Sequence, residues 1–127
     1  MKILALLTIL SVMLFSDIKV ITSEKNGLTS ISYKELSDLY LGKTNSIKGI
    51  KVTPIDNKDS YKEFYKKVIK KTPKQFRAYW LKQIYTTKKQ PPKKLSKQEI
   101  VKLLKINSKV ISYSSNKLTG KIICRVK

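Results

Sequence analysis

Apolar residues recur at helical spacing in four stretches of the chain, which predict four helices. Each stretch places large apolar side chains three and four positions apart, so that they gather on one helix face. The four faces consist of Tyr33, Leu36, Leu39 and Tyr40; Tyr61, Phe64, Tyr65 and Val68; Phe76, Tyr79, Trp80 and Ile84, with Leu81 at the border; and Ile100, Val101, Leu103 and Leu104. We expect these faces to pack on a sheet and the lysines between them to face water.

The expected start of each helix carries a capping-box pattern, a Ser or Thr followed three residues later by Glu or Gln. The hydroxyl residues are Ser32, Ser60, Thr72 and Ser96. Pro73 stands at the first position of the third helix, where its fixed φ suits the helix. Gly42 stands where the first helix is expected to end.

Short apolar runs between the helices predict strands at residues 17–22, 49–55, 109–114 and 121–126. Strands that alternate with helices favour a layered α/β fold, because each helix then covers a sheet. The prediction is therefore one α/β domain over residues 17–127, with a mostly parallel or mixed sheet flanked by about four helices.

Residues 1–16 have the layout of a secretory signal peptide. Lys2 precedes an apolar run over positions 3–15, and the small residue Ser16 ends the segment. The run is shorter than the roughly 20 apolar residues that span a bilayer. We expect cleavage after Ser16 and export to the periplasm. Leu14 stands where a signal peptidase prefers a small residue, so an uncleaved membrane anchor is the alternative.

The composition adds a strong positive charge, with 28 Lys or Arg against 8 Asp or Glu and a formal net charge of +20. Such a charge attracts acidic polymers, membrane surfaces and nucleic acid. All the basic residues except Arg77 and Arg125 are lysines, and they are spread along the chain. General lysine-rich usage gives the same picture, and Lys lacks the bidentate geometry of Arg. No specific recognition of nucleic acid is therefore expected.

Residues typical of enzymes are scarce. The chain has no histidine, and its four glycines are isolated, which excludes an imidazole base and a glycine-rich phosphate loop. Cys124 lies in a predicted strand without a histidine partner, which disfavours a nucleophilic role. We interpret the acidic pairs Glu35 with Asp38 and Asp56 with Asp59 as solvated charges. The prediction is a protein without enzymatic activity, metal or cofactor.

An ordered set of short motifs runs through nearly all of residues 17–127. The motifs are Leu41-Gly42-Lys43, Val52-Thr53-Pro54-Ile55, Phe64, Tyr79-Trp80, Pro91-Pro92 and Ile111-Ser112-Tyr113. In this order they resemble one lobe of the substrate-binding proteins of phosphate ABC transporters, which have a periplasmic-binding-protein-like fold. Members of that family have two lobes and well over twice this length, so the resemblance implies a short, single-lobe member.

The resemblance also implies an anion-binding loop. In the family, hydroxyl and N–H groups of the loop before the second helix hold the anion, and the matching loop here reads DNKDSYKE. The implied anion-facing residues are Asn57, Lys58, Ser60 and Tyr61. The family's glycine is absent from this loop and two aspartates stand in it. Capping of the following helix is the alternative role for Ser60.

Two functions of different classes follow from the sequence. The first is an exported, non-enzymatic, phosphate-binding-like protein, with inorganic phosphate or another anion as ligand and ABC transporter components as partners. A single lobe cannot enclose its ligand, so we expect weak binding. The alternative is a basic surface-interaction protein that adheres to an acidic envelope polymer, a membrane surface or nucleic acid. Its densest basic patches are residues 66–74 and 86–94.

Overall fold

The computed structural model describes residues 17–127, and the predicted signal peptide at 1–16 lies outside the described residues. The strands are β1 (Ile18–Thr22), β2 (Ser46–Ile47), β3 (Ile50–Lys51), β4 (Thr53–Asn57), β5 (Lys93–Leu95), β6 (Val110–Ser114) and β7 (Lys121–Val126). The helices are α1 (Tyr33–Tyr40), α2 (Tyr61–Phe64), the π-helical segment η2 (Tyr65–Ile69) that continues it, α3 (Pro73–Thr87) and α4 (Lys97–Ile106). Helices thus form in all four stretches where helical spacing predicts them.

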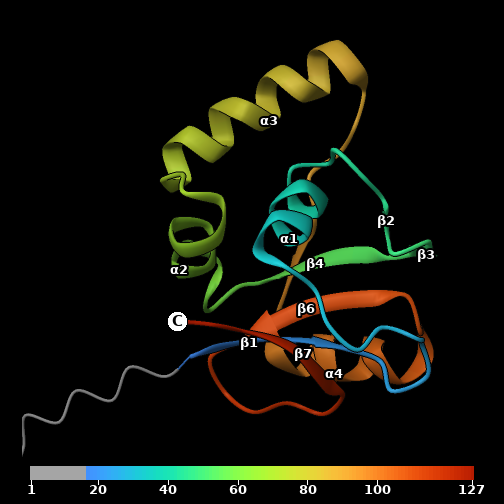
Figure 1. Cartoon of the computed structure of the whole chain (residues 1–127). Coiled ribbons are helices and arrows are strands. Elements are labelled where there is room, and N and C mark those ends of the chain that lie inside the picture. The colour runs from blue at the N-terminus through green and yellow to red at the C-terminus, as the bar shows by residue number, and fades with distance from the viewer. Residues whose placement is uncertain (1–16) are drawn as a thin grey trace, which may run out of the picture.

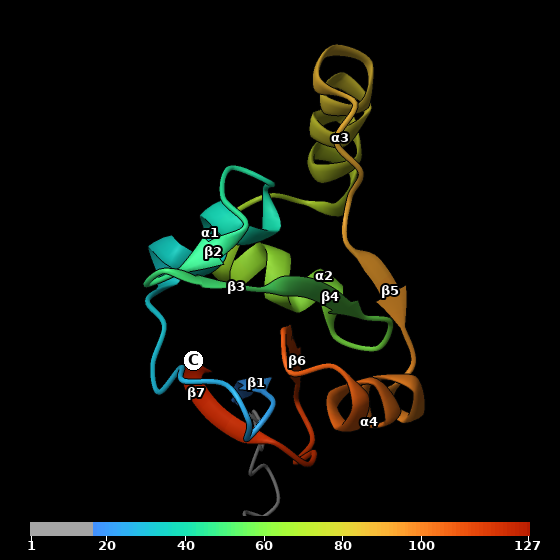
Figure 2. The same cartoon turned by 90° about the vertical axis from the view of Figure 1, so that its right-hand side faces the viewer.

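Five strands form one mixed sheet in the order β5-β4-β6-β1-β7 (Figures 1 and 2). β4 pairs in parallel with β5 and β6, whereas β1 pairs antiparallel with β6 and β7. β2 and β3 form a separate antiparallel pair. The predicted α/β fold with a mixed sheet is confirmed.

The predicted strand over 49–55 is wrong in its boundaries, and the sequence pattern missed β5 altogether. The structure divides the predicted strand because the backbone changes partner at Val52. The Val52 N–H donates to the Asn45 carbonyl at 3.0 Å, and the next N–H, that of Thr53, donates to the Lys109 carbonyl at 2.8 Å. β3 and β4 therefore belong to different sheets.

Both faces of the large sheet carry a hydrophobic core. The larger core joins α1, α2, η2 and α3 to β1 and β6, with Tyr40, Phe64 and Tyr113 fully buried within it. The smaller core joins Ile100 and Leu104 of α4 to residues of β1, β4 and β6. Figure 2 shows the strands lying between α4 and the pair α1 and α2. The domain is therefore a sheet between two helical layers.

Three of the four predicted capping boxes form and one does not. Those of α1, α3 and α4 are complete, with the hydroxyls of Ser32, Thr72 and Ser96 accepting from first-turn N–H groups. Ser60 makes no such bond, because its ψ of 7° departs from the extended backbone of a side-chain cap. Its own N–H instead closes a turn onto the Asn57 carbonyl at 3.2 Å. The predicted capping role of Ser60 is wrong.

Helix α3 projects from the rest of the domain (Figures 1 and 2). Phe76 and Trp80 are its buried residues, which confirms that its aromatic face begins in the core. Leu81 and Tyr85, one and five residues after Trp80, are 60% and 81% exposed. The second half of α3 therefore leaves an apolar strip open to solvent.

Gly120 directly precedes β7, at a position where the structure leaves no room for a side chain. Its φ is +105°, and an added Cβ would lie 2.6 Å from the backbone carbonyl oxygen of Thr22. We expect Gly120→Ala to lower the free energy of unfolding by at least about 2 kcal/mol, because strained φ and a backbone clash add. Gly49→Ala is the control, since Gly49 has φ +83° but open space around it. Urea titrations that gave both variants equal losses would contradict the clash.

Candidate functional site

The loop that carries the predicted anion-binding residues leaves the carboxyl end of β4. β4, β5 and β6 run parallel, so their carboxyl ends lie at one edge of the sheet. The loop is fastened there by Asn57, whose Nδ2 donates to the Tyr113 carbonyl at 2.9 Å, and by the Lys58 N–H, which donates to the Leu95 carbonyl at 3.0 Å. In open α/β sheets this edge is where ligands usually bind.

Ser60 is the chemically conspicuous residue of the loop. It is 7% exposed, and its Oγ is buried without a hydrogen-bond partner within residues 17–127. A buried hydroxyl without a partner costs free energy, of the order of 1–3 kcal/mol. Such a cost is commonly offset by an interaction with a water molecule, an ion or a ligand.

The other three predicted residues differ in what they can offer an anion. Asn57 is buried, and both ends of its amide are occupied, since its Oδ1 accepts from the Asp59 N–H at 2.8 Å. Lys58 is exposed, and it is the positively charged residue of the 57–61 loop. Tyr61 is half-buried, and the Lys94 Nζ lies 4.0 Å from the centre of its ring. The fold thus brings Lys58 and Ser60 to one loop but gives Asn57 a structural role.

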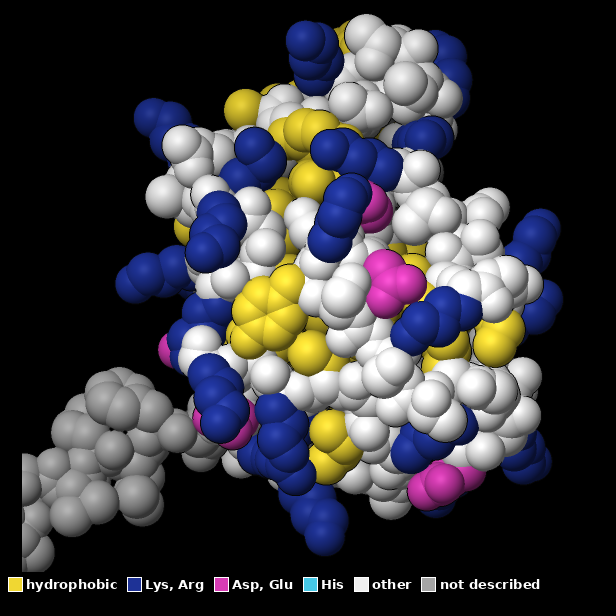
Figure 3. Space-filling view, viewed as in Figure 1, with side chains coloured by type: hydrophobic (Ala, Val, Ile, Leu, Met, Phe, Trp, Pro, Cys, Tyr) yellow, Lys and Arg dark blue, Asp and Glu magenta, His cyan; other side chains and the backbone are white. Residues whose placement is uncertain are grey.

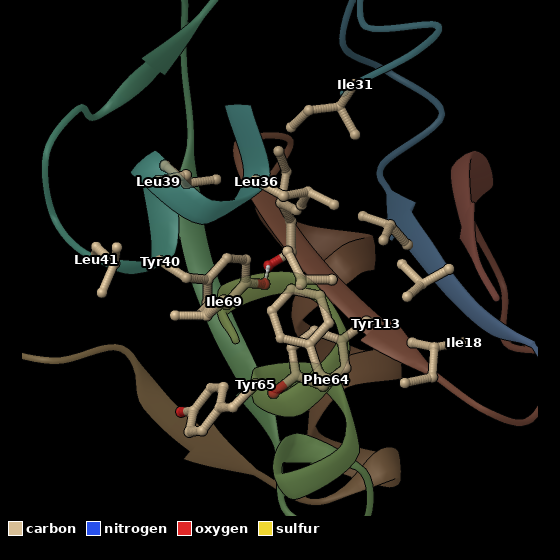
Figure 4. Packing of buried hydrophobic residues seen from close by; sticks show 14 of the residues in the cluster. Ile18, Ile31, Leu36, Leu39, Tyr40, Leu41, Phe64, Tyr65, Ile69 and Tyr113 are labelled. Atoms are coloured by element: carbon tan, nitrogen blue, oxygen red, sulfur yellow. Dashed lines mark hydrogen bonds between the residues drawn. The ribbon is translucent and has the colours of Figure 1, made fainter. Parts of the chain in front are cut away.

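Asp56 lies at the centre of a buried polar cluster, which corrects its interpretation as a solvated charge. It is 1% exposed, and its carboxylate accepts hydrogen bonds from the hydroxyls of Tyr65 and Tyr113, the latter at 2.5 Å. The hydroxyl of Tyr40, in the same core, donates to the carbonyls of Ile55 and Ile111 at 3.0 and 3.2 Å. Figure 4 shows how closely the rings of Tyr40, Phe64 and Tyr113 pack.

Burial governs the proton affinity of this cluster. Loss of solvation raises the pKa of Asp56 to about 6, against the opposing effects of the two tyrosine hydroxyls and the positive charge of Lys94. Burial and the Asp56 carboxylate raise the pKa of Tyr40, Tyr65 and Tyr113 well above their ordinary value. The tyrosines therefore remain hydrogen-bond donors, and Asp56 is the group of this cluster that titrates near pH 6.

On the face shown in Figure 3, many Lys and Arg side chains are spread over the surface and few acidic side chains lie among them. Within residues 17–127 the salt bridges are Lys34 with Asp38 and Lys67 with Glu63, both between exposed or partly exposed side chains one helical turn apart. Over the same residues no three His, Cys, Asp or Glu side chains come together to hold a metal ion. No helix within 17–127 is long and apolar enough to cross a membrane.

Two cavities open on the described part of the chain, and residues 57–61 line neither of them. One, of about 920 Å³, lies between the loop after α1 and the segment 89–93. The other, of about 470 Å³, lies between α3, η2 and β5. An anion on the 57–61 loop would lie in neither of these two cavities.

Comparison with known proteins identifies a distant structural relative. No protein-family model matches the chain, and no curated protein matches it. The structure is similar to the crystal structure of an ABC-type phosphate transport receptor from Vibrio cholerae, with a TM-score of 0.52 and 12% sequence identity. The similarity covers 84% of this chain and 45% of the receptor, so this chain spans less than half of that protein. At this identity the likeness shows the fold, that of a single periplasmic-binding-like domain.

Proposed function

We propose that this chain is an exported, non-enzymatic anion-binding module of the phosphate-receptor type, with the 57–61 loop as its binding site. The fold relationship to a phosphate transport receptor supports the class of protein. The apolar pattern of residues 1–16 supports export, which N-terminal sequencing of secreted protein would test by finding Asp17 first. Inorganic phosphate is the first ligand to test, and ABC transporter components are the corresponding partners.

The buried, unpartnered Ser60 Oγ is the observation that carries this proposal. It lies on the loop at the carboxyl end of β4, beside the exposed Lys58, and a phosphate oxygen would supply the hydrogen bond that Ser60 lacks. Asp59, also exposed on this loop, opposes a second negative charge. Because one lobe leaves the anion hydrated and Asp59 repels it, we expect weak affinity with a preference for singly charged phosphate.

Calorimetric titration of residues 17–127 with phosphate, and with sulfate as control, tests the proposal at about 150 mM salt, where long-range attraction is screened. We expect saturable heat with phosphate and little with sulfate, because sulfate remains a dianion near pH 6 whereas phosphate is largely singly charged. Equal heats for both anions, or none, would contradict a phosphate site. Equal heats that fade steeply with added salt would instead favour adhesion of anions to the basic surface.

Ser60→Ala separates a ligand contact from a structural one. Because Ser60 makes no capping bond, we expect its substitution to leave the free energy of unfolding unchanged or slightly higher, and to abolish the phosphate heat. Ser96→Ala is the matched control, since it removes a complete capping box and should cost about 1 kcal/mol without affecting phosphate binding. Unchanged phosphate affinity in Ser60→Ala would remove the 57–61 loop as the site.

A further inference from the structure

A cavity at the foot of α3 has a mostly apolar lining and shares no lining residue with the 57–61 loop. Its volume is about 470 Å³, within the usual range for small-molecule sites. The apolar walls come from α3 and from the segment that returns from it, as Phe76, Trp80, Leu81, Ile84, Pro91 and Pro92. Figures 1 and 2 show α3 projecting away from the sheet, and Pro91 and Pro92 line the cavity from the segment that returns from α3.

The polar residues of the cavity are arranged with cations outermost. Arg77 and Lys94 line it and are exposed, and neither is in a salt bridge within residues 17–127. Residues 64–98, which supply nearly all of the lining, hold twelve Lys or Arg and no Asp or Glu. No acidic side chain of residues 64–98 compensates these cations, and the acidic residue of the lining is the buried Asp56, which lies beside Lys94 in the register of β4 and β5.

The buried end of the cavity is formed by Asp56 and Tyr65. Hydroxyls of Tyr65 and Tyr113 occupy the Asp56 carboxylate, and Lys94 stands beside Asp56 in the register of β4 and β5. The buried end of the cavity can thus contact an apolar group or a neutral hydrogen-bond donor. It repels a second negative charge, because Asp56 already carries one above its pKa of about 6.

We propose that this cavity binds a small organic monoanion with an apolar body, a medium-chain or aromatic carboxylate. The body would lie between Trp80, Ile84 and the two prolines, where burial of apolar surface supplies the affinity. The carboxylate would lie at the open side between Arg77 and Lys94. The positive charges of these two side chains would make the cavity select an anion. This inference goes beyond the proposed phosphate site and does not depend on it.

Trp80 makes the proposal directly measurable, because it is the only tryptophan of the chain and it lines the cavity. We would titrate the protein with octanoate, octylamine and octanedioate at pH 7.5 and follow Trp80 fluorescence. The change in Trp80 fluorescence should saturate with octanoate. Octylamine should bind at least about tenfold more weakly, because its charge has the wrong sign. Octanedioate should also bind more weakly than octanoate, because its second carboxylate faces Asp56. Equal responses to octanoate and octylamine would overturn the proposal.

Variants distinguish the cavity from general adsorption of a fatty anion to a basic protein. Arg77→Gln with Lys94→Gln should weaken octanoate binding about tenfold, as should Ile84→Ser through loss of an apolar wall. Lys82→Gln and Ile106→Ser are matched controls, because both residues are exposed and lie outside the lining. Equal losses in the lining and control variants would assign octanoate to the basic surface and overturn the site.

Excess phosphate should not compete with octanoate, and competition would likewise contradict two separate sites.

Discussion

Replacing Phe64 with alanine is expected to lower the free energy of unfolding by about 3–5 kcal/mol, the largest effect of any substitution considered. Phe64 is fully buried, stacks on Tyr113 with ring centres 3.8 Å apart, and meets the ring of Tyr40 edge-on at 4.9 Å. Its removal leaves a cavity between α1, α2 and β6 and exposes the tyrosine rings that support the Asp56 cluster. Equilibrium denaturation in urea, read by circular dichroism, measures the loss.

Leu81→Ala is the control for this prediction, since Leu81 also belongs to a helix but is 60% exposed. Its loss should stay within about 0.5 kcal/mol, the usual range for surface positions. Phe64→Leu, which keeps most of the volume, should cost about 1–2 kcal/mol. A Phe64→Ala loss as small as that of Leu81→Ala would mean that the aromatic cluster does not hold the sheet and helices together.

The stability of the protein is expected to fall as the pH rises from about 4 to about 6, because of Asp56. Its carboxyl has a pKa of about 6 in the folded chain, against an ordinary value of 3.8 once unfolding exposes it. Between those two pH values the folded state keeps a proton that the unfolded state has released, so proton binding favours folding at the lower end. A difference of about two pH units corresponds to about 3 kcal/mol, lost as pH rises through this window and constant above it.

Urea denaturation of the wild type and of Asp56→Asn at a series of pH values isolates this contribution. Asparagine does not titrate, so the difference in unfolding free energy between the two proteins should change by about 3 kcal/mol over the window. The groups that face Asp56 are Tyr65, Tyr113 and Lys94. The pKa values of Tyr65 and Tyr113 are raised above their ordinary value, so neither tyrosine titrates between pH 4 and 6. Asp38→Asn, at a partly exposed salt bridge, should keep the wild-type profile. A constant difference for Asp56→Asn would show that Asp56 is not buried as described.

Local chemistry explains which elements the sequence predicts well. The capping boxes at Ser32, Thr72 and Ser96 form because each needs only residues within one helical turn. β5 escaped prediction because its three residues, Lys93–Leu95, carry no apolar alternation. It exists through parallel pairing with β4, and the Lys58 N–H that bonds Leu95 extends the contact. Pairing of that kind leaves no mark on the sequence of the strand itself.

The candidate sites also differ in whether they depend on neighbouring residues or on residues far apart in the sequence. Ser60 and Lys58 were predicted through resemblance to a family motif, and their proximity follows from their place in one loop. The Asp56 cluster was missed because its partners come from positions 9 and 57 residues away. A partial signal was present, since Asp56 follows directly after the predicted strand at 49–55, Tyr65 lies on a predicted apolar helix face and Tyr113 lies in a predicted strand. Only the fold shows that these three side chains meet.

The position of β1 has a consequence for how the chain reaches its native state. β1 begins at Ile18, yet both its partners, β6 and β7, lie within residues 110–126. During synthesis β1 therefore has no strand to pair with until nearly all of the chain has left the ribosome, and closing so long a loop is slow. The sheet around β1 can therefore close only late in synthesis, after β6 and β7 have been made.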